Sequence, residues 1–183
     1  MKDTLRQYEK AVRSCRDIFI KKTQDYGTSW RVLRMISILD QLFIKAKRVR
    51  TLQQRGVSLV KEDISGEFQA MVNYGVIGLI QLELNMDIIE DLDPLRAAAL
   101  YDEKINFVRE LMEKKNHDYG EAWREMSQEG FVDLILMKLL RIRQILNNDG
   151  KTLISEGIDA NLTDIINYAI FALIGIDEGR HRA

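Results

Sequence analysis

The most constraining feature of this 183-residue sequence is an internal duplication. The segment KKTQDYGTSWRVL begins at Lys21, and the similar segment KKNHDYGEAWREM begins at Lys114, an offset of 93 residues. Ten of the 29 positions in 21–49 are identical to those in 114–142, and a later block matches at six of 19 positions with an offset of 94. A solenoid needs about three repeats, so we expect two units related by a pseudo-twofold axis.

The scarcity of proline predicts an all-α fold. The chain has one proline, whereas average use is about 5%, and proline breaks helix interiors. That residue, Pro94, follows Asp93, and an Asp N-cap with Pro at the first helical position is a common helix start. We therefore divide the chain into a first unit, residues 1–92, and a second unit, residues 93–183, packed as one compact domain.

Each unit is predicted to contain three helices. Apolar residues recur at spacings of three and four in the first segment, and Gly27 and Gly120 suit the left-handed position that ends many helices. The third segment is apolar nearly all round, which is typical of a buried helix. The predicted helices are 2–22, 36–54 and one from Ser65, then 94–115, 131–147 and one from Asp159. We expect a six-helix bundle in which the second and third helices of both units form a central four-helix core.

Composition excludes several classes of protein. The chain has 27 Lys and Arg against 28 Asp and Glu, a net charge of −1 that argues against nucleic-acid binding. One cysteine and two histidines cannot form a disulfide or a Cys-rich zinc site. The N-terminus has no apolar stretch typical of a secretory signal, and no clean apolar run reaches membrane-spanning length. We therefore expect a soluble, cytoplasmic protein with no membrane partner.

The second helix of each unit carries two cations three residues apart, which places both on one face. These cations are Lys45 and Arg48 in the first unit and Lys138 and Arg141 in the second. Because neighbouring cations repel, their retention in both units favours an anionic partner. The partner is either a phosphate group or a carboxylate of the protein, and the candidate carboxylates are Asp40, Asp133 and Glu62.

The third segment of each unit carries acidic and amide side chains at matching positions. They are Glu156, Asp164 and Asn167 in the second unit and Glu62, Ala70 and Asn73 in the first, with Glu67 as an additional carboxylate. The second-unit set shares one face if the helix begins early enough to include Glu156. Clustered carboxylates with an amide suit Mg²⁺; the alternative is a solvated acidic helix start, which the helix dipole favours. A buried Asn needs hydrogen-bond partners, and a carboxylate across the bundle is one candidate.

An Asp-Tyr-Gly turn followed by a tryptophan occurs in both units. One interpretation is structural: Asp25 and Asp118 bond backbone amides, and the aromatic side chains cover the end of the bundle. The other is a surface on which a nucleobase stacks. The candidate stacking residues are Tyr26, Trp30, Tyr119 and Trp123.

The combined pattern K-x-x-D-Y-G-x-x-W, D-x4-K-x2-R and E-x10-N-Y resembles the nucleotide modification associated domain 1 family, in which tandem copies are known. That family is distantly similar to the all-α nucleoside triphosphate pyrophosphatases, the MazG-like and dimeric dUTPase-like proteins. The resemblance implies that Glu62, Glu156 and Asp164 match acidic family positions. It also implies that the basic pairs on the second helices contact phosphates.

The carboxylate set of this chain is thinner than that of the family. The family usually has another Asp four residues before the position of Asp164, where this chain has Ala160 in one unit and Gly66 in the other. Ala70 also replaces Asp164 in the first unit. The first unit is therefore expected to be the poorer metal site.

Two functional hypotheses follow. The first is a Mg²⁺-dependent pyrophosphohydrolase that converts a standard or modified nucleoside triphosphate to the monophosphate and pyrophosphate. Its catalytic and metal-binding residues would be Glu156 and Asp164, completed by Glu62 or Glu67. The second is a non-catalytic nucleotide-binding or assembly module with a degenerate metal site. A homodimer of such chains is compatible with either hypothesis.

Overall fold

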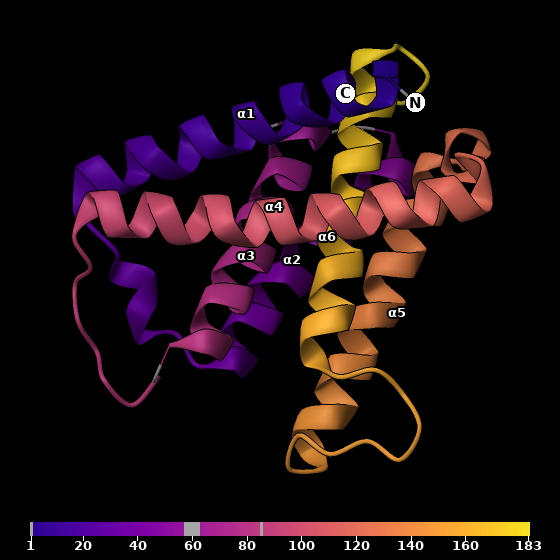
Figure 1. Ribbon diagram of the computed structural model, residues 1–183. Helices are drawn as coiled ribbons and strands as arrows, with labels where there is room; N and C mark the ends of the chain where they lie inside the picture. Colours follow the sequence, from indigo (N-terminus) through magenta and orange to yellow (C-terminus); the bar gives the residue numbers. More distant parts are fainter. Residues whose placement is uncertain (1, 57–62, 85) are drawn as a thin grey trace.

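The computed structural model describes residues 2–56, 63–84 and 86–183, and all regular secondary structure in this part of the chain is helical (Figure 1). The α-helices of the first unit are α1 (Lys2–Tyr26), α2 (Met35–Arg55) and α3 (Ile64–Glu83). Those of the second unit are α4 (Pro94–Tyr119), α5 (Gln128–Asn147) and α6 (Ile158–Asp177). Short 3-10 helices, η1 (Ser29–Val32) and η2 (Ala122–Glu125), carry the shared tryptophans. Three α-helices per unit are confirmed.

Local sequence signals set most of the helix ends. The Asp93 carboxylate caps α4 by accepting hydrogen bonds from the backbone amides of Leu95 and Arg96, as an N-cap does. Gly27 and Gly120 adopt φ angles of 67° and 62°, which confirms the left-handed termini of α1 and α4. Both helices continue through the Asp-Tyr pair, four residues beyond the predicted ends.

The starts of the third helices differ from the prediction. Ser65 is not the N-cap of α3, because Asp63 takes that position and accepts a hydrogen bond from the Gly66 amide at 2.8 Å. Asp159 likewise lies inside α6, whose N-cap is Gly157. The sequence contains several possible N-cap residues close together, and the backbone conformation determines which of them begins the helix.

Two equivalent ion pairs between α1 and α4 demonstrate the pseudo-twofold relation between the units. Arg16 of α1 binds Asp102 of α4 at 2.6 Å, and Arg109 of α4 lies 3.6 Å from Glu9 of α1. A shift of 93 residues exchanges the members of the two pairs. Figure 1 shows α1 and α4 running alongside each other across the other helices.

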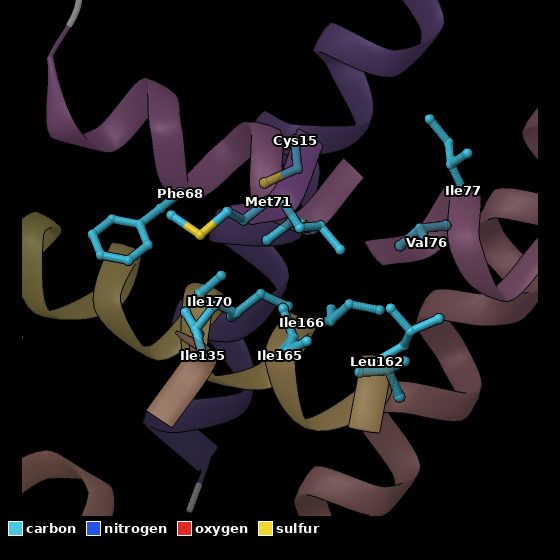
Figure 2. Close-up of a cluster of buried hydrophobic side chains, with 14 of the residues drawn as sticks. Cys15, Phe68, Met71, Val76, Ile77, Ile135, Leu162, Ile165, Ile166 and Ile170 are labelled. Carbon is cyan, nitrogen blue, oxygen red and sulfur yellow. The ribbon is translucent and has the colours of Figure 1, made fainter. Parts of the chain in front are cut away.

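The third helices α3 and α6 form the centre of the bundle, as predicted. They pack against each other, and α2 and α5 pack against them to complete the four-helix core. Figure 2 shows Phe68 and Met71 of α3 on the side that faces the labelled side chains of α6, whereas Ile77 points away from α6. By length and composition α6 resembles a membrane-spanning helix, but 78% of its most apolar window is buried inside the bundle.

Small residues allow α3 and α6 to approach closely. A Cβ atom added to Gly75 would lie 2.6 Å from Cγ1 of Ile166, and one added to Gly78 would lie 2.9 Å from Cδ1 of Leu162. The equivalent positions of α6 are also small, namely Ala169 and Ala172. Larger side chains here would force the central helices apart.

Candidate functional site

Two buried asparagines join the units through tyrosine hydroxyls. Tyr8 of α1 donates to Asn167 Oδ1 on α6 at 2.8 Å. In the equivalent contact, Tyr101 of α4 donates to Asn73 Oδ1 on α3 at 2.7 Å. Burial raises the pKa of both tyrosines, so both hydroxyls remain protonated donors. The amide nitrogens of Asn73 and Asn167 donate to the backbone carbonyl oxygens of Cys15 and Val108, so no carboxylate is among the described partners of these asparagines.

In the second unit, a buried carboxylate lies between two lysines. Asp164 Oδ1 accepts from Lys115 Nζ at 2.7 Å, and Asp164 Oδ2 accepts from Lys138 Nζ at 2.6 Å. Burial by itself would raise the pKa of the Asp164 carboxyl, but the hydrogen bonds from Lys115 and Lys138 outweigh burial and lower that pKa. Helices α4, α5 and α6 each contribute one member of this cluster. Both carboxylate oxygens thus already have ammonium partners.

Glu156 does not share a helix face with Asp164, because α6 begins at Ile158 and Glu156 precedes it. The side chains of Glu156 and Arg141 are both exposed, and both line an open hollow beside α5. Lys138, by contrast, is buried. The predicted cation pair of α5 is therefore divided between the bundle interior and the surface.

No group of three or more His, Cys, Asp or Glu side chains is arranged to hold a metal ion within residues 2–56, 63–84 and 86–183. The predicted ligand Glu62 lies outside the described residues. Asp164 meets two lysines rather than other carboxylates. The donor set around Asp164 therefore fits Mg²⁺ poorly, and magnesium binding stays a prediction.

In the first unit, the buried carboxylate is Glu67. The Arg48 guanidinium donates a hydrogen bond to Glu67 Oε1, and Lys45 Nζ lies 3.6 Å from Glu67 Oε2. Oε2 itself is buried without a hydrogen-bond partner among the described residues. Among the described residues, the basic pair of α2 therefore has Glu67 as an internal anionic partner, a carboxylate that the sequence did not suggest for this pair; the suggested Glu62 lies outside the described residues.

Asp40 and Asp133 form a symmetric pair of contacts between α2 and α5. Arg143 Nη2 lies 3.5 Å from Asp40, and Arg50 Nη1 lies 3.5 Å from Asp133. All four side chains are substantially exposed. These aspartates help to join the two units rather than to bind the basic pairs.

The Asp-Tyr-Gly turns differ from the structural interpretation. Asp25 and Asp118 are exposed, and Asp118 lies 3.1 Å from its neighbour His117. In the first unit, the carboxylate that bonds the turn is Asp91, which accepts from the Thr28 amide at 2.7 Å and from the Thr28 hydroxyl at 2.8 Å. These hydrogen bonds lower the pKa of Asp91. No repeat signal marked Asp91, because it lies in the connection between the units.

A cavity of about 610 Å³ opens in the first unit between α1, η1, α2 and α3. Its lining combines cations, aromatic rings and one carboxylate: Lys22, Lys45, Tyr26, Trp30, Tyr74 and Glu67. Lys22 is exposed and has no ion-pair partner in the described part of the chain. Five of the predicted site residues, Lys45, Glu67, Tyr26, Trp30 and Asn73, thus meet at one cavity.

The two tryptophans have different surroundings. Trp123 stacks on Phe171 with ring centroids 4.2 Å apart, and its Nε1 donates to Asn116 Oδ1 at 3.1 Å. Trp30 instead packs against Phe19 with centroids 6.3 Å apart and rings tilted by 41°. Trp30 Nε1 is buried without a hydrogen-bond acceptor among the residues described. Trp123 is therefore committed to the core, whereas Trp30 lines the cavity with an unused donor.

The tyrosines next to these tryptophans are both exposed, and Tyr26 lines the cavity of the first unit. Burial, followed by the proximity of Tyr74 and Asp25, raises the pKa of the Tyr26 hydroxyl. Tyr119, its counterpart, is 74% exposed. Only the first unit therefore places its turn tyrosine at the mouth of this cavity.

Sequence reasoning missed the lysines at the end of the first helix, Lys22 and Lys115, because the helix dipole was sufficient to explain them. It interpreted the Ala70 difference only as the loss of a metal ligand, and it did not consider the difference at Ile77. Ala70 stands where the second unit has Asp164, and Ile77 stands where it has Phe171. These exchanges, visible in the aligned copies, are the signal that could have located the cavity.

Comparison with known proteins agrees with the two-unit architecture. A family model described as Nucleotide modification associated domain 1 matches residues 22–82 and again residues 115–176. No curated protein and no solved structure showed a significant match. The two matched segments cover more than half of the chain and contain the clusters around Glu67 and Asp164. The chain therefore belongs to the Nucleotide modification associated domain 1 family, with two copies of the domain in tandem.

Proposed function

We propose that the first unit binds a nucleotide in the cavity beside Trp30. The observation that carries this proposal is the lining of that cavity, where two lysines face the same space as aromatic rings. A volume of about 610 Å³ lies within the range of roughly 300–1,000 Å³ that is usual for small-molecule sites. A phosphate-bearing aromatic compound matches both parts of the lining.

The lysines supply the charge for phosphate binding. Lys22 carries no internal ion pair in the described residues, and Lys45 lies 3.6 Å from Glu67 without a hydrogen bond to it. Both ammonium groups are therefore available for charge-assisted hydrogen bonds to phosphate oxygens. The hydrogen bond between Arg48 and Glu67 neutralises the carboxylate that would otherwise repel the ligand.

The aromatic side chains supply the surface for the base. Trp30 is held by the core, and Tyr26 stands at the cavity mouth. An aromatic ring stacked on such side chains gains about 0.5–1.5 kcal/mol beyond its area burial. The rest of the binding energy comes from the phosphates and from burial of the base.

A second candidate is Mg²⁺-dependent hydrolysis of a nucleoside triphosphate, the reaction of the distantly similar pyrophosphatases. The observation that favours it is Glu67 Oε2, a buried carboxylate oxygen at the cavity without a described hydrogen-bond donor. Mg²⁺ is usually bound by one or two carboxylates together with substrate phosphates, and it would supply Lewis-acid stabilisation of the phosphates. The nearby cations oppose metal binding at Glu67, so binding without catalysis is the primary proposal.

Calorimetric titration with the common ribo- and deoxyribonucleotides, without added metal, tests the binding proposal. We expect Lys22→Ala and Lys45→Ala each to weaken binding at least about tenfold, which corresponds to 1.4 kcal/mol. Lys21→Ala and Lys47→Ala are matched controls, because they remove the same charge from the same helices outside the cavity lining. Equal losses in all four variants, or no binding by the wild type, would contradict the proposal.

Product analysis with Mg²⁺ or Mn²⁺ separates the two candidates. Release of monophosphate and pyrophosphate by the wild type, lost in Glu67→Gln while the fold is retained, would support hydrolysis. Binding without turnover, together with unchanged affinity on addition of metal, would support the non-catalytic module.

A further inference from the structure

The second unit shows where an anion sits on the shared lysine pair. Lys115 and Lys138 are the counterparts of Lys22 and Lys45, and they hold the Asp164 carboxylate at 2.7 and 2.6 Å. In the first unit the position of Asp164 is Ala70, which lines the cavity together with both lysines. The place of one carboxylate is thus open in the first unit.

The second unit also shows where an aromatic ring sits on the shared tryptophan. Phe171 stacks on Trp123 with ring planes only 5° apart. The corresponding position is Ile77, which lines the cavity next to Trp30. Isoleucine has no ring to stack on the indole, so no aromatic side chain occupies the position of Phe171 in the first unit. Trp30 and Trp123 are nevertheless buried to the same degree, at 8% and 7% exposed.

The indole nitrogen supplies an independent observation. Trp123 Nε1 donates to Asn116 at 3.1 Å, but the matching residue in the first unit is Thr23. The Thr23 hydroxyl is used as a donor to the Phe19 carbonyl oxygen at 2.9 Å, and Trp30 Nε1 has no acceptor among the described residues. Since buried donors are almost always paired, a ligand acceptor near Thr23 would complete the site.

We infer that the Asp164 carboxylate and the Phe171 ring occupy the positions in the second unit that a bound ligand occupies in the first unit. This inference rests on the proposed nucleotide-binding function. The ligand places an anionic group between Lys22 and Lys45, over Ala70, and an aromatic ring against Trp30. The second unit, filled by its own side chains, binds no nucleotide.

The spacing between Asp164 and Phe171 indicates the class of ligand. Asp164 and Phe171 are seven residues apart on α6, which corresponds to about 10 Å along the axis at 1.5 Å per residue. The phosphate of a nucleoside monophosphate lies close to its base, whereas the distal phosphates of di- and triphosphates lie farther away. Nucleoside di- and triphosphates therefore fit the first unit better than monophosphates do.

The first test introduces a carboxylate at position 70 of the first unit. Ala70→Asp places a carboxylate between Lys22 and Lys45, as Asp164 does in the second unit, and Ala70→Asn is the matched uncharged control. Binding of the common ribo- and deoxyribonucleoside 5′-diphosphates is measured by calorimetry. We expect one site per chain in the wild type, at least about a tenfold loss of affinity in Ala70→Asp, and a much smaller change in Ala70→Asn.

The outcomes separate this inference from the proposal on which it rests. If the wild type binds none of these nucleotides, the proposed function fails and the inference fails with it. If the wild type binds but Ala70→Asp and Ala70→Asn bind equally well, only the inference is overturned. Equal affinity for monophosphates and diphosphates of the same base would overturn the assigned ligand class.

The second test removes the Asp164 carboxylate from between Lys115 and Lys138. Asp164→Ala leaves Lys115 and Lys138 without their carboxylate, so inorganic phosphate should raise the melting temperature of this variant by several degrees more than that of the wild type. Sodium chloride of equal ionic strength is the control. Equal stabilisation of both proteins by phosphate would overturn the inference. The Ala70 variants decide the question on their own if Asp164→Ala does not fold.

Discussion

The two units keep the same cations but place their buried carboxylate one helical turn apart. In the second unit the carboxylate is Asp164, and in the first it is Glu67, three residues before the position that matches Asp164. The side chains of Asp164 and Lys138 are each 9% exposed, whereas Lys45 and Arg48 remain 29% and 23% exposed. Lys138 is thus buried together with Asp164, whereas Lys45 lines the cavity of the first unit.

The surroundings of the shared tryptophans also differ between the two units. Trp123 is covered by Phe171 and approached by the Arg124 guanidinium at 4.4 Å. Trp30 has Ile77 in place of that phenylalanine and borders the cavity. The second unit therefore uses its shared residues for packing, whereas in the first unit Trp30, which is also buried, borders a cavity.

The largest expected effect separates the two carboxylates. Asp164→Ala leaves the buried Lys138 ammonium without its partner, so we expect a loss of about 3–5 kcal/mol in the free energy of unfolding. Glu67→Ala should cost less, about 1–3 kcal/mol, because Lys45 and Arg48 can reach solvent. Urea denaturation measures both, and a greater loss for Glu67→Ala would contradict this ranking.

Breaking the symmetric tyrosine contacts tests whether the units share a structural frame. Tyr8→Phe and Tyr101→Phe each leave a buried asparagine oxygen without its hydroxyl donor, at a cost of about 1–3 kcal/mol. Because the two contacts are equivalent, the losses should agree closely. Guanidinium denaturation of both variants provides the comparison, and a strongly unequal pair would show that one unit depends less on this contact.

Ile77→Phe should make the first unit resemble the second. A ring at this position would cover Trp30 as Phe171 covers Trp123, and nucleotide affinity should fall at least about tenfold, or 1.4 kcal/mol. Ile77→Leu keeps a side chain of similar volume and is the matched control. Calorimetric titration is the measurement, and tight binding by Ile77→Phe would place the base elsewhere.

Acid should remove the difference between the wild type and Asp164→Asn. The pKa of Asp164 is lowered in the folded protein, so its contribution to stability is complete above the unfolded pKa of about 3.9 and declines as pH falls through the folded pKa. The stability gap between the two proteins should be constant from about pH 5 to pH 7 and narrow below about pH 4. Thermal melts across this range would detect a gap that instead persists in acid.

The smallest expected effect concerns the exposed contacts between α2 and α5. Asp40→Asn and Asp133→Asn each remove an exposed ion pair with an N–O distance of 3.5 Å, which is typically worth 0.2–1 kcal/mol, or about 0.5 kcal/mol. The two losses should be similar and should shrink in high salt. A loss above about 2 kcal/mol in either variant would show that these pairs do more than join exposed surfaces.

Much of the fold could be predicted because its signals are local or repeated. Asp93 and Pro94 mark a helix start through a side chain and a ring that act on adjacent residues. The left-handed ends at Gly27 and Gly120 follow from a conformation that glycine adopts without a Cβ clash. The apolar character of the third helices was likewise sufficient to place them at the centre of the bundle.

The candidate site was only partly predictable. The sequence singled out Lys45, Glu67 and Trp30, which the structure brings to one cavity. It also placed Glu156 on the same helix face as Asp164. That prediction required the helix to begin before Glu156, whereas α6 begins at Ile158. Spacing along one helix does not identify the start of that helix when more than one N-cap is available.

The sequence by itself determined the duplication, the helix content and the shared cations, because each is a property of neighbouring or repeated residues. Only the tertiary structure decided which carboxylate each cation meets, and which tryptophan stacks on a phenylalanine ring. Those pairings join α1, α2 and α3, or α4, α5 and α6, across distances that depend on how the helices pack. Asp164 thus lies between two lysines of the second unit, whereas Glu67, the buried carboxylate of the first unit, lies one turn before the matching position and meets Lys45 and Arg48.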